Sequence, residues 1–204
     1  MTKLDLKKHH RELFNPPKHA FVEVTPPTMS FVKADGSGNP NTAAAYRSAV
    51  EWLYGVSYAM KFAAKDGLAR DYVVPPLEAL WWSDDAGSFT RREKDRWQWT
   101  VMIMAPDFVT EAMFEAAVAK TLLKRNDRPT TLRFEPYTEG RSLQILHIGS
   151  YDDEGPALAR LHDDVMPGLG VTFNGPHHEI YLSDPRKVEP NRLRTILRQP
   201  IRDV

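Results

Sequence analysis

The sequence predicts an α+β protein made of two copies of a strand-helix-strand-strand unit. Three observations indicate this fold class: short strand-like runs rich in β-branched and aromatic residues, an amphipathic helix pattern after the first strand of each half, and two further strand-like runs after each helix. By analogy with other duplicated chains, we expect two similar units related by a pseudo-twofold axis.

The composition limits the classes of function. With 42% hydrophobic and 26% charged residues among 204, the chain is typical of a soluble globular protein. Lys+Arg and Asp+Glu both number 27, so no global basic field favours nucleic acid. The chain has no cysteine, which excludes disulfides and thiolate metal sites. Without a signal-peptide pattern or a long apolar run, we expect a cytoplasmic protein with no nucleic-acid or membrane partner.

The first half begins with an arm, residues 1–27, in which paired prolines bracket a short extended run. A strand then runs into a Gly/Asn/Pro turn, after which Asn41 or Thr42 is expected to cap a helix. Apolar residues at steps of three and four predict this helix over residues 43–65, with Gly67 in the C-cap position.

Two strand-like runs complete the first repeat, residues 28–106. They are "DYVVPPLEALWWSDD" and "RWQWTVMIMAP", and the polar loop 83–95 between them is typical of a hairpin. Residues 107–140 follow as a connector helix and loop, with Asp107 in the first turn of the helix, where an acid suits the helix dipole.

The second repeat, residues 141–204, has the same order of elements. "SLQILHIGSYDDEG" predicts a strand and turn, and "GPALARLHDDVMPGLG" predicts a helix that Pro167 and Gly168 stop. "GPHHEIYLSDP" and "RLRTILRQPI" predict the last two strands.

The two halves can be aligned in two registers. Aligning "LWWSD" with "IYLSD" on the Ser-Asp pair matches Trp81 with Tyr181 and Ala79 with Glu179. Aligning on the glutamates instead matches Glu78 with Glu179, a slip of one residue that exchanges the two faces of the strand. We prefer the Ser-Asp register because it keeps more identities.

Several segments resemble the GyrI-like (gyrase-inhibitor-like) small-molecule-binding family, in particular its stand-alone members of about this length. They are "LKKHHRELFNPPKHAFVEV", "FVKADGSGNPN", "LYGVSYAMKFAAK", "PPLEALWW", "WQWTVMIMAPDFV" and "HHEIYLSDPRKVEPNRLRTILRQP". The resemblance covers nearly the whole chain and implies one domain with a concave antiparallel sheet and helices on one face. It also implies a groove that holds a hydrophobic, planar or cationic ligand over aromatic side chains and a buried glutamate.

The resemblance bears on function in two further ways. Many relatives carry a helix-turn-helix regulator, but only about twenty residues precede the first strand here, too few for such a module. Stand-alone members resembling this chain hydrolyse the strained cyclopropane of duocarmycin-like and yatakemycin-like DNA alkylators with an aromatic cage. The resemblance therefore permits hydrolytic detoxification of xenobiotics without a cofactor; the alternative is a non-catalytic protein that binds or sequesters small molecules.

Glu179 is the predicted catalytic residue. It lies inside the apolar run "EIYL", where a carboxylate is costly unless it is paired or neutral. There it could face a ligand cation, or orient or deprotonate the attacking water; the alternative is a glutamate bound to a backbone amide or an arginine. Tyr181 shares its face by the period of two, and Trp81 follows through the Ser-Asp register. We expect Trp81 in the groove and Trp82 on the helix-packing side.

The other candidates are weaker. Trp97 and Trp99 share one face of their strand and suit core or groove equally, while Met102 on the opposite face suits a tolerant ligand surface. His177 and His178 diverge from one another in a strand and lack a third ligand at metal-binding spacing, so no metal site is expected. The predicted ligand contacts are Trp81, Tyr181, Glu78, Trp82, Trp97, Trp99, Met102, Tyr137 and His178.

Overall fold

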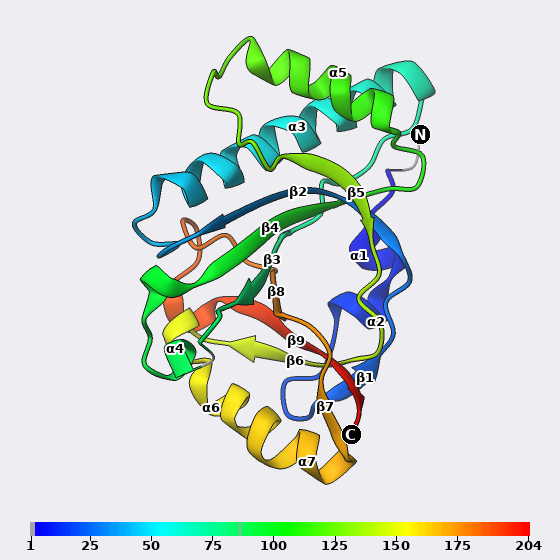
Figure 1. Cartoon of the computed structure of the whole chain (residues 1–204). Helices are drawn as coiled ribbons and strands as arrows, with labels where there is room; N and C mark the ends of the chain where they lie inside the picture. Colours follow the sequence, from blue (N-terminus) through cyan, green and yellow to red (C-terminus); the bar gives the residue numbers. More distant parts are fainter. Residues whose placement is uncertain (1–2, 86) are drawn as a thin grey trace. The chain divides into compact units, whose positions relative to one another are not determined.

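The computed structural model describes residues 3–85 and 87–204, and the chain divides into two compact units (Figure 1). The first unit comprises Met1–His9 and Thr28–Tyr137, and the second comprises His10–Pro27 and Thr138–Val204. Both units combine helices with antiparallel strands, which confirms the predicted α+β class. Among the helices of the described residues, none has the length and apolar character needed to cross a membrane.

The first unit contains a four-stranded antiparallel sheet with helices α3 and α5 packed on one face (Figure 1). The order of elements β2-α3-β3-β4 is the predicted strand-helix-strand-strand repeat. The strands across the sheet are β3 (Leu77–Trp82), β4 (Gln98–Ala105), β2 (Met29–Ser37) and β5 (Arg133–Tyr137); the helices are α1 (Leu6–His9), α3 (Ala44–Leu68), α4 (Gly87–Thr90), η1 (Lys94–Arg96) and α5 (Glu111–Leu122).

The core of the first unit follows from two periodicities. Along α3, buried residues recur at steps of three and four, as the sequence predicts; they are Ala49, Trp52, Leu53, Val56, Met60 and Ala64. Along β4, alternate residues Trp99, Val101 and Ile103 share one face and are all buried. The Trp99 ring lies over Gly36, where a Cβ atom would come within 2.3 Å of it, so this tryptophan requires glycine on the neighbouring strand.

The predicted caps of α3 are wrong. No side chain caps its start, because the residue at the N-cap is Ala43, and the backbone N–H groups of Thr42 and Ala43 donate to Asn39 O in a turn before the helix. Gly67 lies inside the helix. The end is at Ala69, which adopts the left-handed conformation (φ 52°), so an alanine takes the position that glycine normally favours.

The predicted connector is an integral part of the first unit. Its helix, α5, begins at Glu111 rather than near Asp107, because Thr110 caps it by accepting a hydrogen bond from Met113 N. The expected loop after it contains β5, which pairs with β2. Phe134 of β5 stacks on Phe114 of α5, with ring centroids 5.8 Å apart, so helix and strand pack together.

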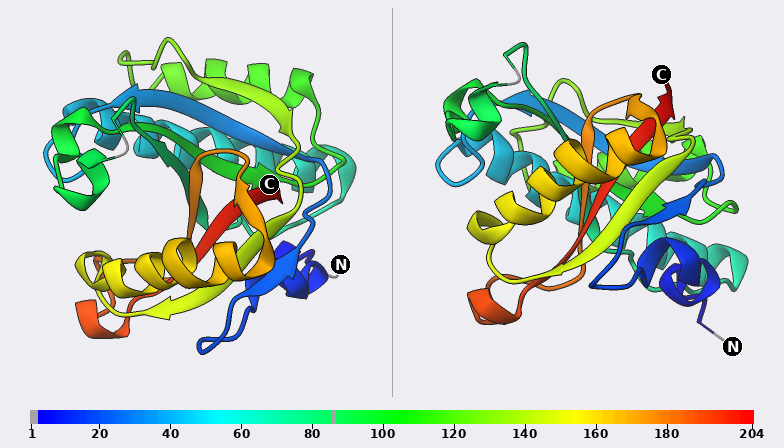
Figure 2. Two further views of the ribbon diagram at one scale, coloured as in Figure 1. Left: turned by 60° about the horizontal axis from the view of Figure 1, so that its bottom comes forward. Right: turned by 90° about the horizontal axis from the view of Figure 1, so that it is seen from below.

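The second unit also contains an antiparallel sheet, and a helical segment over residues 155–169 packs on one of its faces (Figure 2). The strands in order are β1 (Val22–Val24), β6 (Ser142–Ile148), β9 (Arg194–Asp203) and β8 (His177–Tyr181), with β7 (Val171–Phe173) paired to the end of β9. The helices are α2 (Arg11–Phe14), η2 (Tyr151–Asp153), α6 (Gly155–Ala159), η3 (Arg160–Val165), α7 (Met166–Leu169) and η4 (Pro190–Arg192).

The helical segment does not stop at Pro167 and Gly168, so that prediction is wrong. Helix α6 continues through a π-helical stretch, η3, into α7, where Pro167 lies in the first turn and its missing N–H is tolerated. The segment ends at Gly170, whose φ of 67° is left-handed. β7 then adds a strand that the sequence pattern did not predict.

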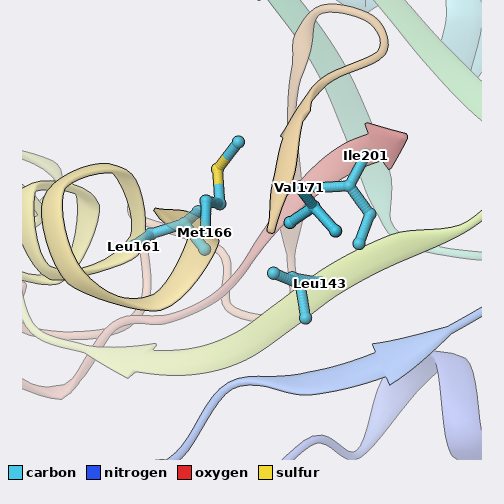
Figure 3. Packing of buried hydrophobic residues seen from close by; sticks show 5 residues of the cluster. All are labelled: Leu143, Leu161, Met166, Val171 and Ile201. Carbon is cyan, nitrogen blue, oxygen red and sulfur yellow. The ribbon is translucent and has the colours of Figure 1, made fainter. Parts of the chain in front are cut away.

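A hydrophobic cluster fixes this helical segment to the sheet (Figure 3). Leu161 and Met166 from the helical segment pack against strand residues, and Leu161 is completely buried. The members of the cluster are Leu143, Leu161, Met166, Val171 and Ile201.

The opposite face of the second sheet carries a buried ionic cluster. Glu139 accepts hydrogen bonds from Arg198 Nη1 at 2.9 Å and from His178 Nδ1 at 2.7 Å, and each of these side chains is at most 3% exposed. Arg198 also donates to Leu13 O and to Gln144 Oε1. Since Leu13 lies in α2, the cluster anchors the N-terminal segment of this unit to the sheet.

The ionisation of this cluster makes the free energy of unfolding depend on pH. Burial alone would raise the pKa of Glu139, but the charges of His178 and Arg198 and their hydrogen bonds lower it to about 2. Burial also lowers the pKa of His177, to about 3, with His162 and His178 adding to the effect. Both groups bind protons more readily in the unfolded chain, so the free energy of unfolding falls as pH falls toward 3.

Replacing Leu161 by alanine tests the cluster of Figure 3. We expect the free energy of unfolding to fall by about 2–5 kcal/mol, because the change leaves a cavity at a fully buried position. The control is Leu169→Ala in the same helical segment, where the side chain is 55% exposed and a much smaller loss is expected. Urea denaturation measures both; equal losses would contradict the packing described.

Replacing Glu139 by glutamine tests the ionic cluster. At pH 7 we expect a loss of about 3–5 kcal/mol, because Arg198 stays buried without its carboxylate. Between pH 4.5 and 2 the stability of the variant should fall less steeply than that of the parent, since the lowered carboxyl pKa is gone. Glu23→Gln is the matched control, because Glu23 pairs with Arg141 at a largely exposed position. Identical pH profiles of parent and Glu139→Gln would refute the assignment.

Candidate functional site

Aromatic side chains gather on the helix-bearing face of the first sheet. Trp81 of β3 and Trp99 of β4 are direct cross-strand partners. The ring of Tyr46, from the first turn of α3, stacks on Trp81 at 6.0 Å and meets Trp99 edge-on at 5.0 Å. Trp97 lies edge-on to Trp81 at 5.8 Å, and Phe89 of α4 lies 5.0 Å from Trp97. We call these five residues the aromatic cluster.

The aromatic cluster also holds buried polar groups. The indole Nε1 of Trp99, in a residue 1% exposed, has no hydrogen-bond partner among the described residues, while Trp97 Nε1 donates to Ser88 O at 3.5 Å. Sequence reasoning found the three tryptophans of the cluster but missed Tyr46 and Phe89. In the sequence, Tyr46 is one more apolar position of the helix pattern. Phe89 lies in a loop outside the strand patterns, directly between two polar residues, Ser88 and Thr90.

The prediction that Trp82 packs on the helix side is wrong. Trp81, which stacks on Tyr46 of α3, occupies that side, and alternation along β3 places Trp82 on the opposite face. The sequence alone could not decide this, because it shows that the two tryptophans diverge but not on which side the helix lies.

The helix-free face of the first sheet carries the remaining candidates of this unit. Glu78 and Met102 are cross-strand partners and are 1% and 0% exposed. Tyr137 lies further across the same face, with the Lys33 ammonium 4.8 Å from its ring centroid. Lys33 in turn pairs with Glu135 at 3.0 Å. Glu78, Trp82, Met102 and Tyr137 therefore share one face, separate from the aromatic cluster.

Glu179 lies on the helix-bearing face of the second sheet. Its cross-strand partner is Leu197, which pairs with Ile145 on the side where the helical segment packs. Tyr181 Oη donates to Glu179 Oε2 at 2.7 Å, and His177 Nε2 lies 3.7 Å from Glu179 Oε1. The side chains of His177 and Glu179 are each 15% exposed, so the carboxylate has limited access to solvent.

A second tyrosine completes this group. The Tyr151 ring packs edge-on against Tyr181 with centroids 5.6 Å apart. Burial, followed by the negative charge of Glu179, raises the pKa of Tyr151 to about 12, so its hydroxyl stays protonated at neutral pH. We call Tyr151, His177, Glu179 and Tyr181 the Glu179 cluster. Tyr151 was missed because it lies in the turn after β6, outside any strand pattern.

The two units support the Ser-Asp register when each is considered by itself. Trp81 and Tyr181 both lie on the face of their own sheet that carries a helix. Glu78 and His178 occupy the corresponding positions three residues earlier, on the helix-free faces, and both are 1% exposed. The predicted site residues are thus divided between the two faces in each unit.

Metal binding has no support in the described residues, where no group of three or more His, Asp or Glu side chains could hold an ion. His178 and His177 point to opposite faces of β8, as the sequence predicts. His178 belongs to the ionic cluster with Glu139 and Arg198, a role that sequence reasoning missed. The available signal was an arginine inside the apolar run "TILRQP".

Comparison with solved structures finds close relatives. An uncharacterized conserved protein from Listeria innocua is 35% identical and aligns over 98% of this chain and 100% of its own, with a TM-score of 0.89. A hydrolase from Listeria innocua is 34% identical with the same coverage and a TM-score of 0.87. The EcmrR C-terminal domain is 12% identical over 91% of this chain and 97% of its own, with a TM-score of 0.56, a likeness of fold alone.

Comparison by sequence gives the family. No curated protein matches the chain. The profile of the GyrI-like small-molecule-binding domain matches residues 20–202, which is most of both units. The chain belongs to the GyrI-like small-molecule-binding family.

Proposed function

We propose that the protein binds planar hydrophobic xenobiotics, neutral or cationic, with Glu179 as the acidic group of the site. The observation that carries the proposal is the environment of this carboxylate. It is mostly buried, it is held by the Tyr181 hydroxyl, and the ring of Tyr151 packs on that of Tyr181. A carboxylate among aromatic rings attracts a cation by charge and a planar body by stacking.

The neutral state of His177 strengthens the proposed preference of Glu179 for a cationic ligand. Its lowered pKa, about 3, keeps the imidazole uncharged at neutral pH, so this side chain adds no positive charge beside Glu179. A carboxylate beside a neutral imidazole attracts a ligand cation, or polarises a water molecule, more strongly than one beside an imidazolium. Limited solvent access makes either interaction stronger than it would be in bulk water.

The same group could support hydrolysis of a cyclopropane-bearing alkylator. In this step Glu179 takes a proton from water while the water oxygen bonds to a ring carbon. The ring C–C bond breaks, and its electron pair moves into the conjugated carbonyl of the alkylator, which receives a proton in turn. The sum is addition of one water molecule. A Listeria innocua relative described as a hydrolase favours an enzyme, although its substrate is not stated.

The second candidate is a binder without chemistry. It needs the same acidic and aromatic groups, since sequestering a planar cation uses charge and stacking alone. The family profile, which describes small-molecule binding, favours this candidate as much as the first.

Glu179→Gln separates these functions. We expect the rate at which a cyclopropane-bearing alkylator is ring-opened to fall to the rate in buffer, because the glutamine amide cannot accept the proton from water. Mass spectrometry of the ring-opened product measures this rate. Affinity for ethidium, a planar cation, should fall several-fold. Glu189→Gln is the matched control, an exposed glutamate of the same unit, and should leave both unchanged.

Three results would decide between the candidates. Turnover by the parent that Glu179→Gln abolishes supports the enzyme. Ethidium binding without turnover supports the binder. Unchanged turnover and unchanged ethidium affinity in Glu179→Gln would remove Glu179 from the site.

A further inference from the structure

The second unit has a surface pocket that belongs to neither the Glu179 cluster nor the ionic cluster. It has a volume of about 460 Å³ and lies where β6 meets the start of the helical segment and the chain before β1. A smaller pocket of about 290 Å³ adjoins it and shares Arg160. The larger pocket is lined by Lys18, Ile145, Leu146, His147, Ile148, Pro156, Ala157 and Arg160.

The charged side chains of both pockets are basic. Lys18 and Arg160 line the larger pocket, and the described residues that line the two pockets include no aspartate or glutamate. Within the described residues, neither cation has a carboxylate oxygen within 4 Å, unlike Arg141 and Arg198 of the same unit. The two cations of the pocket are therefore not in direct contact with a carboxylate of the part of the chain that the structure describes.

Arg160 is partly pre-positioned. Its Nη1 donates to His19 O at 3.3 Å, and the guanidinium carbon lies 5.2 Å from the Phe21 ring centroid. These contacts hold the planar group beside both pockets while leaving other N–H donors for a ligand. A guanidinium held in this way loses less side-chain freedom on binding an anion.

The rest of the larger pocket is mainly apolar and accessible. Ile148 is 48% exposed, and Pro156 and Ala157 complete the apolar part of the lining. Among the described strands, β1 pairs with β6 at Ser142–Gln144 only, and none pairs with the later part of β6 on this side. Leu146 N instead donates to Pro17 O, which brings the segment with Lys18 to the pocket.

We propose that this pocket binds an organic anion, a molecule with an apolar body and one carboxylate or sulfonate group. The anionic group would pair with Lys18 and Arg160, and the body would cover Ile148 and Ala157. This selectivity is opposite to that proposed for the Glu179 cluster, so the two sites would accept different molecules. The inference does not depend on the function proposed for Glu179.

The test compares two probes that differ by one sulfonate, 8-anilinonaphthalene-1-sulfonate and uncharged N-phenyl-1-naphthylamine. In the Lys18→Gln/Arg160→Gln variant, affinity for the sulfonate should fall about five- to tenfold, because two partly exposed charge contacts are lost. Affinity for the neutral probe should stay unchanged. The control is Lys8→Gln/Arg192→Gln, which removes two exposed cations outside the pocket. It should leave both affinities unchanged.

Filling the pocket gives a second, independent variant. Ala157→Phe keeps both cations and should abolish binding of the sulfonate at this site, since the new ring would occupy the space of the apolar body. Glu179→Gln should leave sulfonate binding unchanged. Sulfonate affinity that is unaffected by Lys18→Gln/Arg160→Gln and by Ala157→Phe would overturn the proposal, whatever the outcome for Glu179.

Discussion

The energetic cost of burying a carboxylate determines which acids of this chain maintain the fold and which can act on a ligand. Glu139 is buried against Arg198 and His178, so its charge is compensated within the protein, and Arg198 in turn holds α2 against the second sheet. Glu179 is buried less completely and accepts a hydrogen bond from the hydroxyl of Tyr181, and the neutral imidazole of His177 lies nearby. The charge of Glu139 is thus committed to structure, whereas Glu179 lies among tyrosines and a neutral imidazole.

The period of two in β3 and β8 then determines which residues can act together. It could be read from the sequence, and it correctly places Tyr181 beside Glu179 and separates Trp81 from Trp82. The side on which the helix packs could not be read, because it depends on the packing of α3 across the sheet. For the same reason the Ser-Asp register was predictable and the position of Trp82 was not.

Local and long-range features differ in how well the sequence predicted them. The strand-helix-strand-strand order and the long α3 follow from local periodicity. β5 and the ionic cluster do not, since β5 is defined by pairing with β2, and Glu139 meets Arg198 across 59 positions of the chain. The end of α3 is at Ala69 instead of Gly67, so an exposed alanine adopts a left-handed conformation against its local preference, with its backbone N–H donating to Ala64 O.

The second unit shows how one small sheet can hold opposite electrostatic environments. On the helix-bearing face, the carboxylate of Glu179 lies among tyrosines; at the edge of β6, Lys18 and Arg160 flank apolar surface. The ionic cluster on the opposite face of the sheet compensates its own carboxylate, because Glu139 pairs with both Arg198 and His178. Because attraction between exposed charges falls off over about 8–10 Å in physiological salt, local side chains rather than net charge would set the ligand preference of each proposed site.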